Sequence, residues 1–452
     1  MSSGGDLSKI TVLEGQLYRD KEWLQRLGIN SEEFKFLVNS KIFRAEESAS
    51  YQLSFVGIVI FSNSLLLALP KFCDVQNISM QRILEILKVY FRRSQKRRPI
   101  TDQRRDPEFG NEQILREYDA MYALRDWFFH HGIYRRDEAE TGKSGKVHWA
   151  KTISKRIPLL SRSGVVYPEV IGERKVSTFN EISSLQIEIL QYLLKRYDED
   201  LPLQVSQAQQ SQENYLLRDI LHPNKRPFLL RRLALEKREV YQSEKVRLLD
   251  LLTQIVDSRL AESASQPQIY GTTAFYSVWE DVCRSVLCGT APLDPESLLG
   301  EPVWKIPLER GEVKTYRMRQ IPDMVLIRNS WRFIIDAKYY YRFPFSHPGA
   351  QDIVKQFYYL DSMQPTSDQI ASIFLLPLPG AHKAQFLGIA TIENGQRNFG
   401  SIEAWGLDPV MLLNHYVAQS PAGHNSLIDP ILLARANMSE MRSQAPAFVS
   451  SQ

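Results

Sequence analysis

The sequence predicts an α/β (α+β) protein of several domains, and three observations support this. At 452 residues the chain is about three times as long as a common single domain. Its fractions of hydrophobic residues, 43%, and of charged residues, 24%, are ordinary for a globular protein. Short apolar runs typical of strands alternate with helical patterns. We therefore expect an N-terminal region with strands, a helical middle region, and a C-terminal region built around a central strand pair.

Changes in composition divide the chain. A β/α domain is expected over residues 1–175, as a docking region for a partner or DNA, and a helical scaffold over 176–265. The polar segment ESASQPQ leads into a third domain over 266–436. Residues 437–452 lack a core pattern, which predicts a disordered tail.

The N-terminal region contains the most apolar part of the chain. YQLSFVGIVIF and LLLALPKF flank a polar SNS, which predicts two strands joined by a turn within residues 51–72. SMQRILEILKVYFRR follows with apolar residues at helical spacing and Ser79 as its N-cap. The apolar run is too interrupted to span a membrane, and the N-terminus lacks the apolar core of a signal peptide. With three cysteines and no disulfide pattern, a cytoplasmic location is expected.

A basic segment follows that helix, with eight lysines or arginines against one acid over residues 88–105. Two interpretations stay open. The cations complement the helix dipole at its C-terminal end, or they contact nucleic acid or an acidic partner. In the second case we expect DNA contacts from four arginines of this segment: Arg92, Arg93, Arg97 and Arg98.

The middle of the chain is mostly helical by pattern. Helices are expected at residues 111–131 and 178–203, and one or two more over 216–259 with a break near HPNKRP. A loop-rich stretch between the first two contains GKS. A P-loop needs a glycine five residues before Gly142, where Asp137 stands, so this chain is not expected to bind a nucleotide.

Charges stand inside a predicted strand pair in IPDMVLIRNSWRFIIDAKYYYR, residues 321–342. A two-residue turn at Asn329–Ser330 sets Asp323 opposite Asp336, with Cβ atoms roughly 5 Å apart. Lys338 follows two residues later and projects from the same face. The neighbouring residues are apolar on both faces, which predicts a strand pair covered on both sides.

Two opposed carboxylates repel each other, and nothing in a sheet requires them. A divalent cation removes the conflict, because Mg²⁺ takes carboxylate oxygens and keeps positions for water and a phosphate. Lys338 can then orient the attacking water or stabilise charge on the phosphate. The spacing predicts phosphodiester hydrolysis with Mg²⁺, or with Mn²⁺ as a substitute. The alternative, a surface hairpin with exposed charges, suits the two-sided apolar pattern poorly.

Pro322-Asp323 followed by Asp336-Ala337-Lys338 resembles the motif of the PD-(D/E)XK nuclease superfamily. The resemblance implies an αβββαβ core, a central mixed sheet flanked by helices. It also implies metal ligation by Asp323, Asp336, the backbone carbonyl of Ala337 and an upstream acid. The helix predicted for TTAFYSVWEDVC offers Glu280 for this catalytic position, and Asp281 stays an alternative.

The downstream helix DIVKQFYYLDSM places Gln356 and Tyr359 on one face. Some members of the superfamily carry such a pair near the substrate, which implies a catalytic role for Gln356 and DNA contacts by Tyr359 and Lys355. Ordinary helix residues are the alternative interpretation. A later strand is expected at residues 370–376.

Four segments together resemble LlaJI-type restriction endonucleases, which are similar to the McrC nuclease subunit: FVGIVIF…LALPK, GKVHWAKTI, YGTTAFYSVWEDVC and IPDMVL…DAKYY…DIVKQFYY. The resemblance implies an endodeoxyribonuclease of a restriction or antiviral defence system that acts on double-stranded DNA with a separate McrB-like AAA+ GTPase. A homodimer or larger assembly is expected, because cutting both strands needs two sites. Two alternatives stay open: a DNA repair or processing exonuclease, and a non-catalytic DNA-binding assembly subunit.

Overall fold

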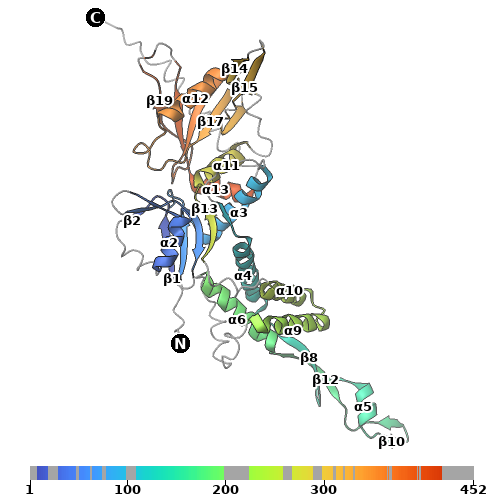
Figure 1. The fold of residues 1–452 in the computed structure, drawn as a ribbon. Coiled ribbons are helices and arrows are strands. Elements are labelled where there is room, and N and C mark those ends of the chain that lie inside the picture. The colour runs from blue at the N-terminus through green and yellow to red at the C-terminus, as the bar shows by residue number, and fades with distance from the viewer. Residues whose placement is uncertain are drawn as a thin grey trace. The chain divides into compact units, whose positions relative to one another are not determined.

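The chain folds into mixed α/β structure with several sheets (Figure 1). This computed structural model describes residues 8–18, 29–46, 50–61, 64–73, 78–97, 108–197, 223–257, 267–288, 298–308, 312–318, 321–328, 331–363, 365, 369–393, 395 and 399–419. Within these ranges, none of the helices is both long and apolar enough to cross a membrane. The predicted tail at 437–452 lies outside the described residues.

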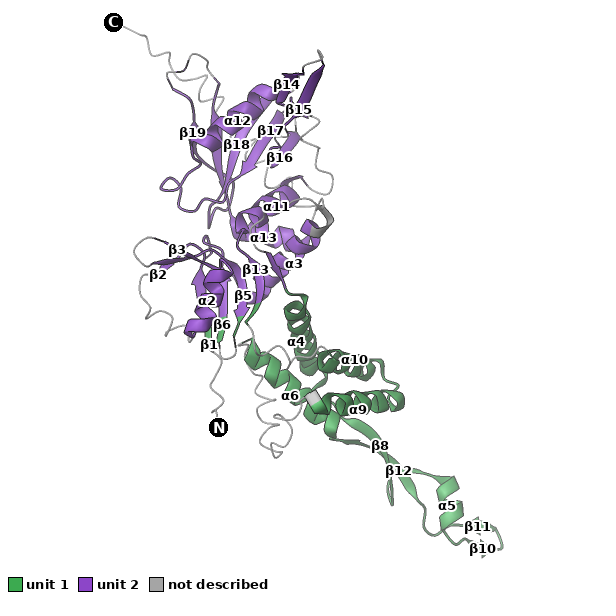
Figure 2. Cartoon of the chain, in the orientation of Figure 1, with its two compact units in different colours: residues 1–9, 60–65, 111–268 green, residues 10–59, 66–110, 269–452 purple. Residues whose placement is uncertain are grey.

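Two compact units divide the chain, and each is assembled from separate segments (Figure 2). One unit contains residues 1–9, 60–65 and 111–268. The other contains residues 10–59, 66–110 and 269–452. The N-terminal strands thus share a unit with the C-terminal part of the chain.

The first sheet has five strands in the order β1-β6-β5-β13-β7. Their bounds are Ser8–Leu13 for β1, Val56–Ile60 for β5, Ser64–Leu69 for β6, Glu108–Gly110 for β7 and Gln268–Thr272 for β13. The predicted strand pair is confirmed as β5 and β6, and the Phe61 N–H donates to the Ser64 carbonyl at 2.8 Å. At Gly57, with φ +144°, a Cβ would lie 2.2 Å from the Tyr270 carbonyl, so only glycine lets β13 approach this closely.

A small sheet and two helices complete the N-terminal region. The sheet has the order β2-β4-β3, with β2 at Leu17–Tyr18, β3 at Phe43–Ala45 and β4 at Tyr51–Leu53. Helix α2, Ser31–Asn39, is capped by the Asn30 side chain. Helix α3, Met80–Arg97, confirms the predicted helix, and the Ser79 hydroxyl accepts the Arg82 N–H at 3.3 Å.

Helices dominate the unit that contains residues 111–268. They are α4 (Glu112–His131), α5 (Trp149–Lys155), α6 (Glu181–Arg196), α9 (Arg226–Glu239) and α10 (Ser243–Asp257), with a 3₁₀ turn η2 at Pro223–Lys225. Helix α4 confirms the helix predicted at 111–131. Helix α6 confirms most of the helix predicted at 178–203, whose last residues, 198–203, lie outside the described residues. The described part of 216–259 contains two helices, but the break between α9 and α10 was not predicted. Pro227 lies in the first turn of α9, where a missing N–H does no harm.

The stretch expected to be loop-rich contains strands, so that prediction is wrong. Strands β8 (Arg136–Gly142), β9 (Lys146–Val147), β10 (Leu159–Ser161), β11 (Gly164–Val166) and β12 (Gly172–Thr178) lie here. β12 pairs antiparallel with β8 over all its residues. Most of their side chains are exposed, so the apolar alternation that identifies half-buried strands is missing.

A mixed five-stranded sheet forms the C-terminal region, in the order β16-β17-β18-β20-β19. Its strands are β16 (Met324–Arg328), β17 (Trp331–Ala337), β18 (Gln369–Pro377), β19 (Gln385–Ala390) and β20 (Ile402–Leu407), and a separate pair is β14 (Val303–Pro307) with β15 (Val313–Arg317). Helix α11 (Phe275–Cys288) contacts β16 and β17, and α12 (Ala350–Ser362) contacts β17, β18 and β20. Helix α13, Pro409–Ala418, packs on α11 and α3. The strand predicted at 370–376 is confirmed as β18.

The register of the central hairpin agrees with the prediction. Met324 pairs with Ile335, and the next step along the ladder sets Asp323 opposite Asp336. The turn residues Asn329–Ser330 lie outside the described residues. One expectation is corrected: β17 lies inside the sheet, whereas β16 is an edge strand, so the pair is not central in the sheet. Met324 and Val325 of β16 are buried, but Ile327 is exposed, so only the first part of β16 is covered on both faces.

Candidate active site

Two aspartates meet where β16 begins and β17 ends. Asp336 is 1% exposed, and Asp323 directly precedes β16. The Asp323 Oδ2 accepts the Ala337 N–H at 2.8 Å, and the Arg284 Nε donates to the Asp323 carbonyl at 2.7 Å. Because Arg284 lies on α11, both the neighbouring strand and this helix fix Asp323.

The Lys338 ammonium lies among carboxylates. Its Nζ is 2.9 Å from Asp336 Oδ2 and 2.7 Å from Asp352 Oδ1. Its backbone N–H donates to the Leu375 carbonyl on β18 at 2.8 Å. The structure therefore brings Asp323, Asp336 and Lys338 together, as the strand register predicts.

Asp352 is a site residue that the sequence analysis missed. It lies in the first turn of α12, where its Oδ2 accepts the Gly349 N–H at 3.2 Å. An acid at this helix position is ordinary N-terminal capping chemistry, so nothing in the sequence pattern linked it to Lys338. The contact is evident only when α12 is docked on the sheet.

The two candidates for the upstream acid have different surroundings. Asp281 is buried, and its Oδ2 accepts from Arg93 Nε at 3.0 Å and from the Tyr416 hydroxyl at 2.6 Å. Those bonds tie α11 to α3 and α13. Glu280 instead feels the charges of Asp336 and Lys338. The contacts of Asp281 thus lead to α3 and α13, whereas the charge of Glu280 interacts with Asp336 and Lys338, and this favours Glu280 as the candidate for the upstream acid.

The acids of the site crowd one another in a poorly solvated place. Burial, with the charges of Glu280 and Asp336, raises the pKa of Asp323 from its usual 3.8 to about 8. Burial and the charge of Asp336 also raise the pKa of Glu280. Burial alone would lower the pKa of Lys338, but its bonds to Asp352 and Asp336 outweigh this and raise it. The ionised acids are therefore destabilised unless further positive charge is supplied.

This donor set fits a divalent cation. Among the described residues, no three acidic, histidine or cysteine side chains are arranged to hold an ion by themselves. The site instead offers two facing carboxylates, Asp323 and Asp336, with Glu280 acting on both by its charge. Carboxylate oxygens with room for water are the ligands that Mg²⁺ prefers, and Mn²⁺ accepts them too.

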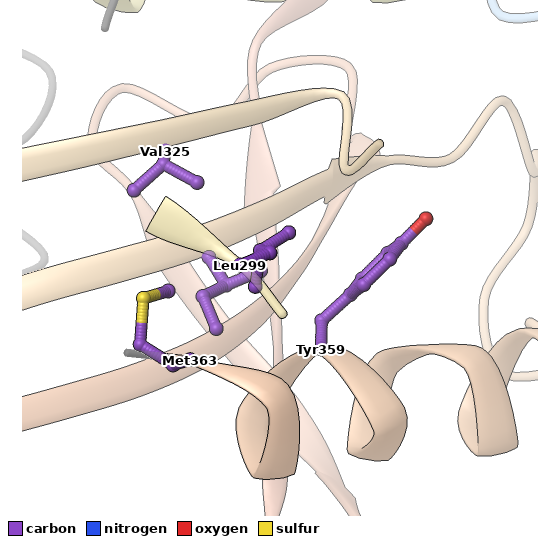
Figure 3. Close-up of a cluster of buried hydrophobic side chains, with 5 residues drawn as sticks. Leu299, Val325, Tyr359 and Met363 are labelled. Atoms are coloured by element: carbon purple, nitrogen blue, oxygen red, sulfur yellow. The ribbon is translucent and has the colours of Figure 1, made fainter. Parts of the chain in front are cut away.

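Gln356 and Tyr359 lie in the core. Both side chains are fully buried, and Gln356 Nε2 donates to the Ile334 carbonyl at 3.1 Å, which ties α12 to β17. Tyr359 packs in a hydrophobic cluster with Leu299, Val325, Ile334 and Met363, and its hydroxyl points away from the other labelled side chains (Figure 3). Lys355 is exposed, and its Nζ lies 5.5 Å from the centroid of the Tyr359 ring. Burial raises the pKa of the Tyr359 hydroxyl, and the charges of Asp336 and Asp323 act in the same direction. Packing accounts for the buried parts of the pair, and the contacts of Gln356, Tyr359 and Lys355 with a substrate stay a prediction.

The basic residues of α3 are only partly described. Arg92 is exposed. The Arg93 guanidinium is held by Asp281, so a phosphate would have to compete with that ion pair. The side chain of Arg97 and all of Arg98 lie outside the described residues.

Comparison with known proteins adds a family to this geometry. The family model of the LlaJI restriction endonuclease matches residues 55–393. A "Type II restriction enzyme BsuMI component YdjA" of Bacillus subtilis (strain 168) is 24% identical over 394 residues, covering 80% of this chain and 79% of the relative.

Two solved assemblies of Thermococcus gammatolerans are also similar at low level. The McrB AAA+ hexamers with bound McrC align at 13% identity and TM-score 0.35, covering 91% of this chain and 99% of the other. The McrBC complex aligns at 13% identity and TM-score 0.24, covering 56% and 86%. The match of the family model over most of the sequence is the decisive finding: the chain belongs to the LlaJI restriction endonuclease family.

Proposed function

We propose that this chain is the nuclease subunit of a restriction system and that it hydrolyses phosphodiester bonds of double-stranded DNA with Mg²⁺ or Mn²⁺. One observation carries the proposal. Asp323, Asp336 and Lys338 meet at one end of two paired strands, in a member of a restriction endonuclease family. The mixed sheet, whose strands both α11 and α12 contact, supports a core of PD-(D/E)XK type.

Each side chain has a distinct task in the proposed reaction. Asp323 and Asp336, with Glu280 and the carbonyl of Ala337, would hold the cation. When bound, the cation would polarise a phosphoryl oxygen and provide a water of lowered pKa. Lys338, held by its bonds to Asp336 and to Asp352 on α12, would orient that water or stabilise charge developing on the phosphate.

A separate AAA+ GTPase is part of the proposal. The GKS segment lacks the glycine that a P-loop requires, so any NTP-driven step needs another subunit. The Bacillus relative is itself named a component of its restriction enzyme. Two active sites are needed to cut both strands, so we further propose that the chain acts as a dimer or in a larger assembly.

The test is cleavage of supercoiled plasmid by the purified chain, alone and with an McrB-like AAA+ GTPase added as the proposed partner. We expect Mg²⁺-dependent nicking or linearisation that EDTA stops and that Asp336→Asn abolishes. A closed circle that stays intact while linear DNA is degraded favours a processing exonuclease instead. If no DNA is cut under any of these conditions, the non-catalytic assembly subunit becomes the better description.

A further inference from the structure

The N-terminal region reaches the residue next to Lys338. The buried Tyr339 donates its hydroxyl hydrogen bond to Glu14 Oε2 at 2.5 Å and accepts the Lys71 N–H at 3.2 Å. The Lys71 ammonium lies 4.1 Å from the centroid of the same ring. Both partners come from the segments around β1 and β6, so residues more than 250 positions apart in the sequence hold one tyrosine.

Aromatic packing extends this contact to helix α11, which carries Glu280. The Phe72 ring lies 5.7 Å from the ring of Tyr339 and 5.8 Å from that of Trp279. Phe275 lies 5.5 Å from Tyr339. Phe275 and Trp279 belong to α11, and Trp279 directly precedes Glu280. The same cluster therefore fixes both the strand end that carries Lys338 and the helix that carries Glu280.

The polar partners in this contact are themselves fixed. The Glu14 N–H donates to the Leu69 carbonyl at 2.9 Å, which anchors its backbone to the end of β6. Burial raises the pKa of the Glu14 carboxyl and lowers the pKa of the Lys71 ammonium. Loss of the tyrosine hydroxyl would leave the Glu14 carboxyl without this donor, which is unfavourable for a poorly solvated group.

We propose that Tyr339 is a positioning residue of the nuclease reaction, because Glu14 and Lys71 hold it and thereby fix the backbone from which Lys338 reaches the phosphate. The inference rests on the proposed function and deepens it. Consecutive residues of an extended chain project to opposite sides, so Tyr339 anchors the strand end while Lys338 faces the acids. A shift of about 1 Å at a reacting group can lower a rate roughly 100-fold.

The experiment compares Tyr339→Phe with Tyr358→Phe in plasmid cleavage by the full chain together with the proposed McrB-like AAA+ GTPase. Tyr358 lies on α12 and is a matched control, because its hydroxyl also donates one hydrogen bond, to the Gly300 carbonyl at 3.1 Å. For Tyr339→Phe we expect kcat to fall roughly ten- to hundredfold with KM for DNA unchanged. Tyr358→Phe should keep the wild-type kcat. Thermal melting, run in parallel, gives the folded fraction of each variant.

A second pair of variants tests the partner. Glu14→Gln keeps an acceptor for the tyrosine hydroxyl and should retain most of the wild-type kcat, whereas Glu14→Leu should match Tyr339→Phe. If Tyr339→Phe does not fold, the Glu14 pair decides.

If the wild type cuts DNA and Tyr339→Phe or Glu14→Leu has the same kcat as the wild type, the inference is overturned but the proposed function is not. An equal fall in kcat for Tyr339→Phe and Tyr358→Phe has the same consequence, since that indicates a general packing defect. A wild-type chain that never cuts overturns the proposed function, and this inference with it.

Discussion

Replacing Asp323 by asparagine should stabilise the metal-free protein and abolish cleavage. The amide keeps the size of the side chain and an oxygen that can accept the Ala337 N–H. It removes a carboxylate whose ionised form is disfavoured by burial and by the charges of Glu280 and Asp336. A residue that lowers stability while it serves catalysis is typical of a metal ligand in a site without its metal.

The size of the effect follows from the pKa of Asp323, which rises from 3.8 to about 8. Because the folded protein binds this proton more tightly, the stabilisation is complete below pH 3.8 and is lost as the pH rises toward 8. At about 1.4 kcal/mol per pKa unit, the loss by pH 7 is at most roughly 4 kcal/mol. With relaxation of the site we expect Asp323→Asn to be about 2 kcal/mol more stable at that pH.

The assay is thermal melting in EDTA from pH 4.5 to 8, followed by the same series in Mg²⁺. In EDTA the melting temperature of Asp323→Asn should exceed that of the wild type by a few degrees near pH 7.5, and the gap should narrow toward pH 4.5. In Mg²⁺ the wild type should gain stability by mass action and the variant should not. Asp361→Asn, an exposed acid on α12, is the control and should change neither melting nor cleavage. Equal melting of wild type and Asp323→Asn at every pH in EDTA, or cleavage by the variant, would refute the reasoning.

Three further predictions concern the same site. Lys338→Ala should lower cleavage roughly 100-fold or more while Mg²⁺-dependent DNA binding persists, and full activity of this variant in single-turnover assays would contradict the assigned role. In the absence of metal, Lys338→Ala should also have a lower melting temperature than the wild type, since the buried Asp336 loses its ion pair with the Lys338 ammonium. Glu280→Gln should reduce cleavage at least tenfold without lowering the melting temperature, since it too replaces a partly buried acid of raised pKa. Asp281→Asn should instead lower the melting temperature, because its bonds to α3 and α13 weaken. The opposite pattern would exchange the two assignments. In the wild type, the apparent affinity for Mg²⁺ should rise about tenfold per pH unit up to about pH 8, because the Asp323 carboxyl must lose its proton to bind the ion. Calorimetry that detects no release of protons on Mg²⁺ binding would argue against this.

The core of the site could be predicted because its geometry is local. Once a strand pair and a tight turn are assumed, the register fixes the pairing of Asp323 with Asp336, and the two-residue period fixes the face of Lys338. The observed pairing of Met324 with Ile335 agrees with this. Hairpin register depends on a few neighbouring residues, and this is why the sequence alone was sufficient.

Contacts made by distant segments could not be predicted in this way. Asp352 reaches Lys338 only through the docking of α12, and Glu14 reaches Tyr339 only through the docking of the N-terminal sheet. Gln356 and Tyr359 were predicted to share a helix face, but that spacing does not distinguish a buried face from an exposed one, and both side chains are buried. Strands β8 and β12 were missed for a third reason. Alternation of apolar and polar residues indicates a strand with one buried face, and most side chains of these two strands are exposed.

The contacts of Lys338 are one reason to expect that a metal is needed in addition to the lysine. One ammonium contacts two carboxylates, those of Asp336 and Asp352, so its charge is already shared. Asp323 lies beyond these contacts, and its oxygen is held by a neutral backbone N–H instead. Burial is the main cause of its raised pKa, and the charges of Glu280 and Asp336 raise it further, because ionisation of Asp323 adds a negative charge beside them. A divalent cation between Asp323 and Asp336 would supply that charge and leave Lys338 in place to act on the phosphate. The fixed lysine and the under-compensated aspartate are thus two parts of one arrangement, and the melting series in EDTA and Mg²⁺ tests both.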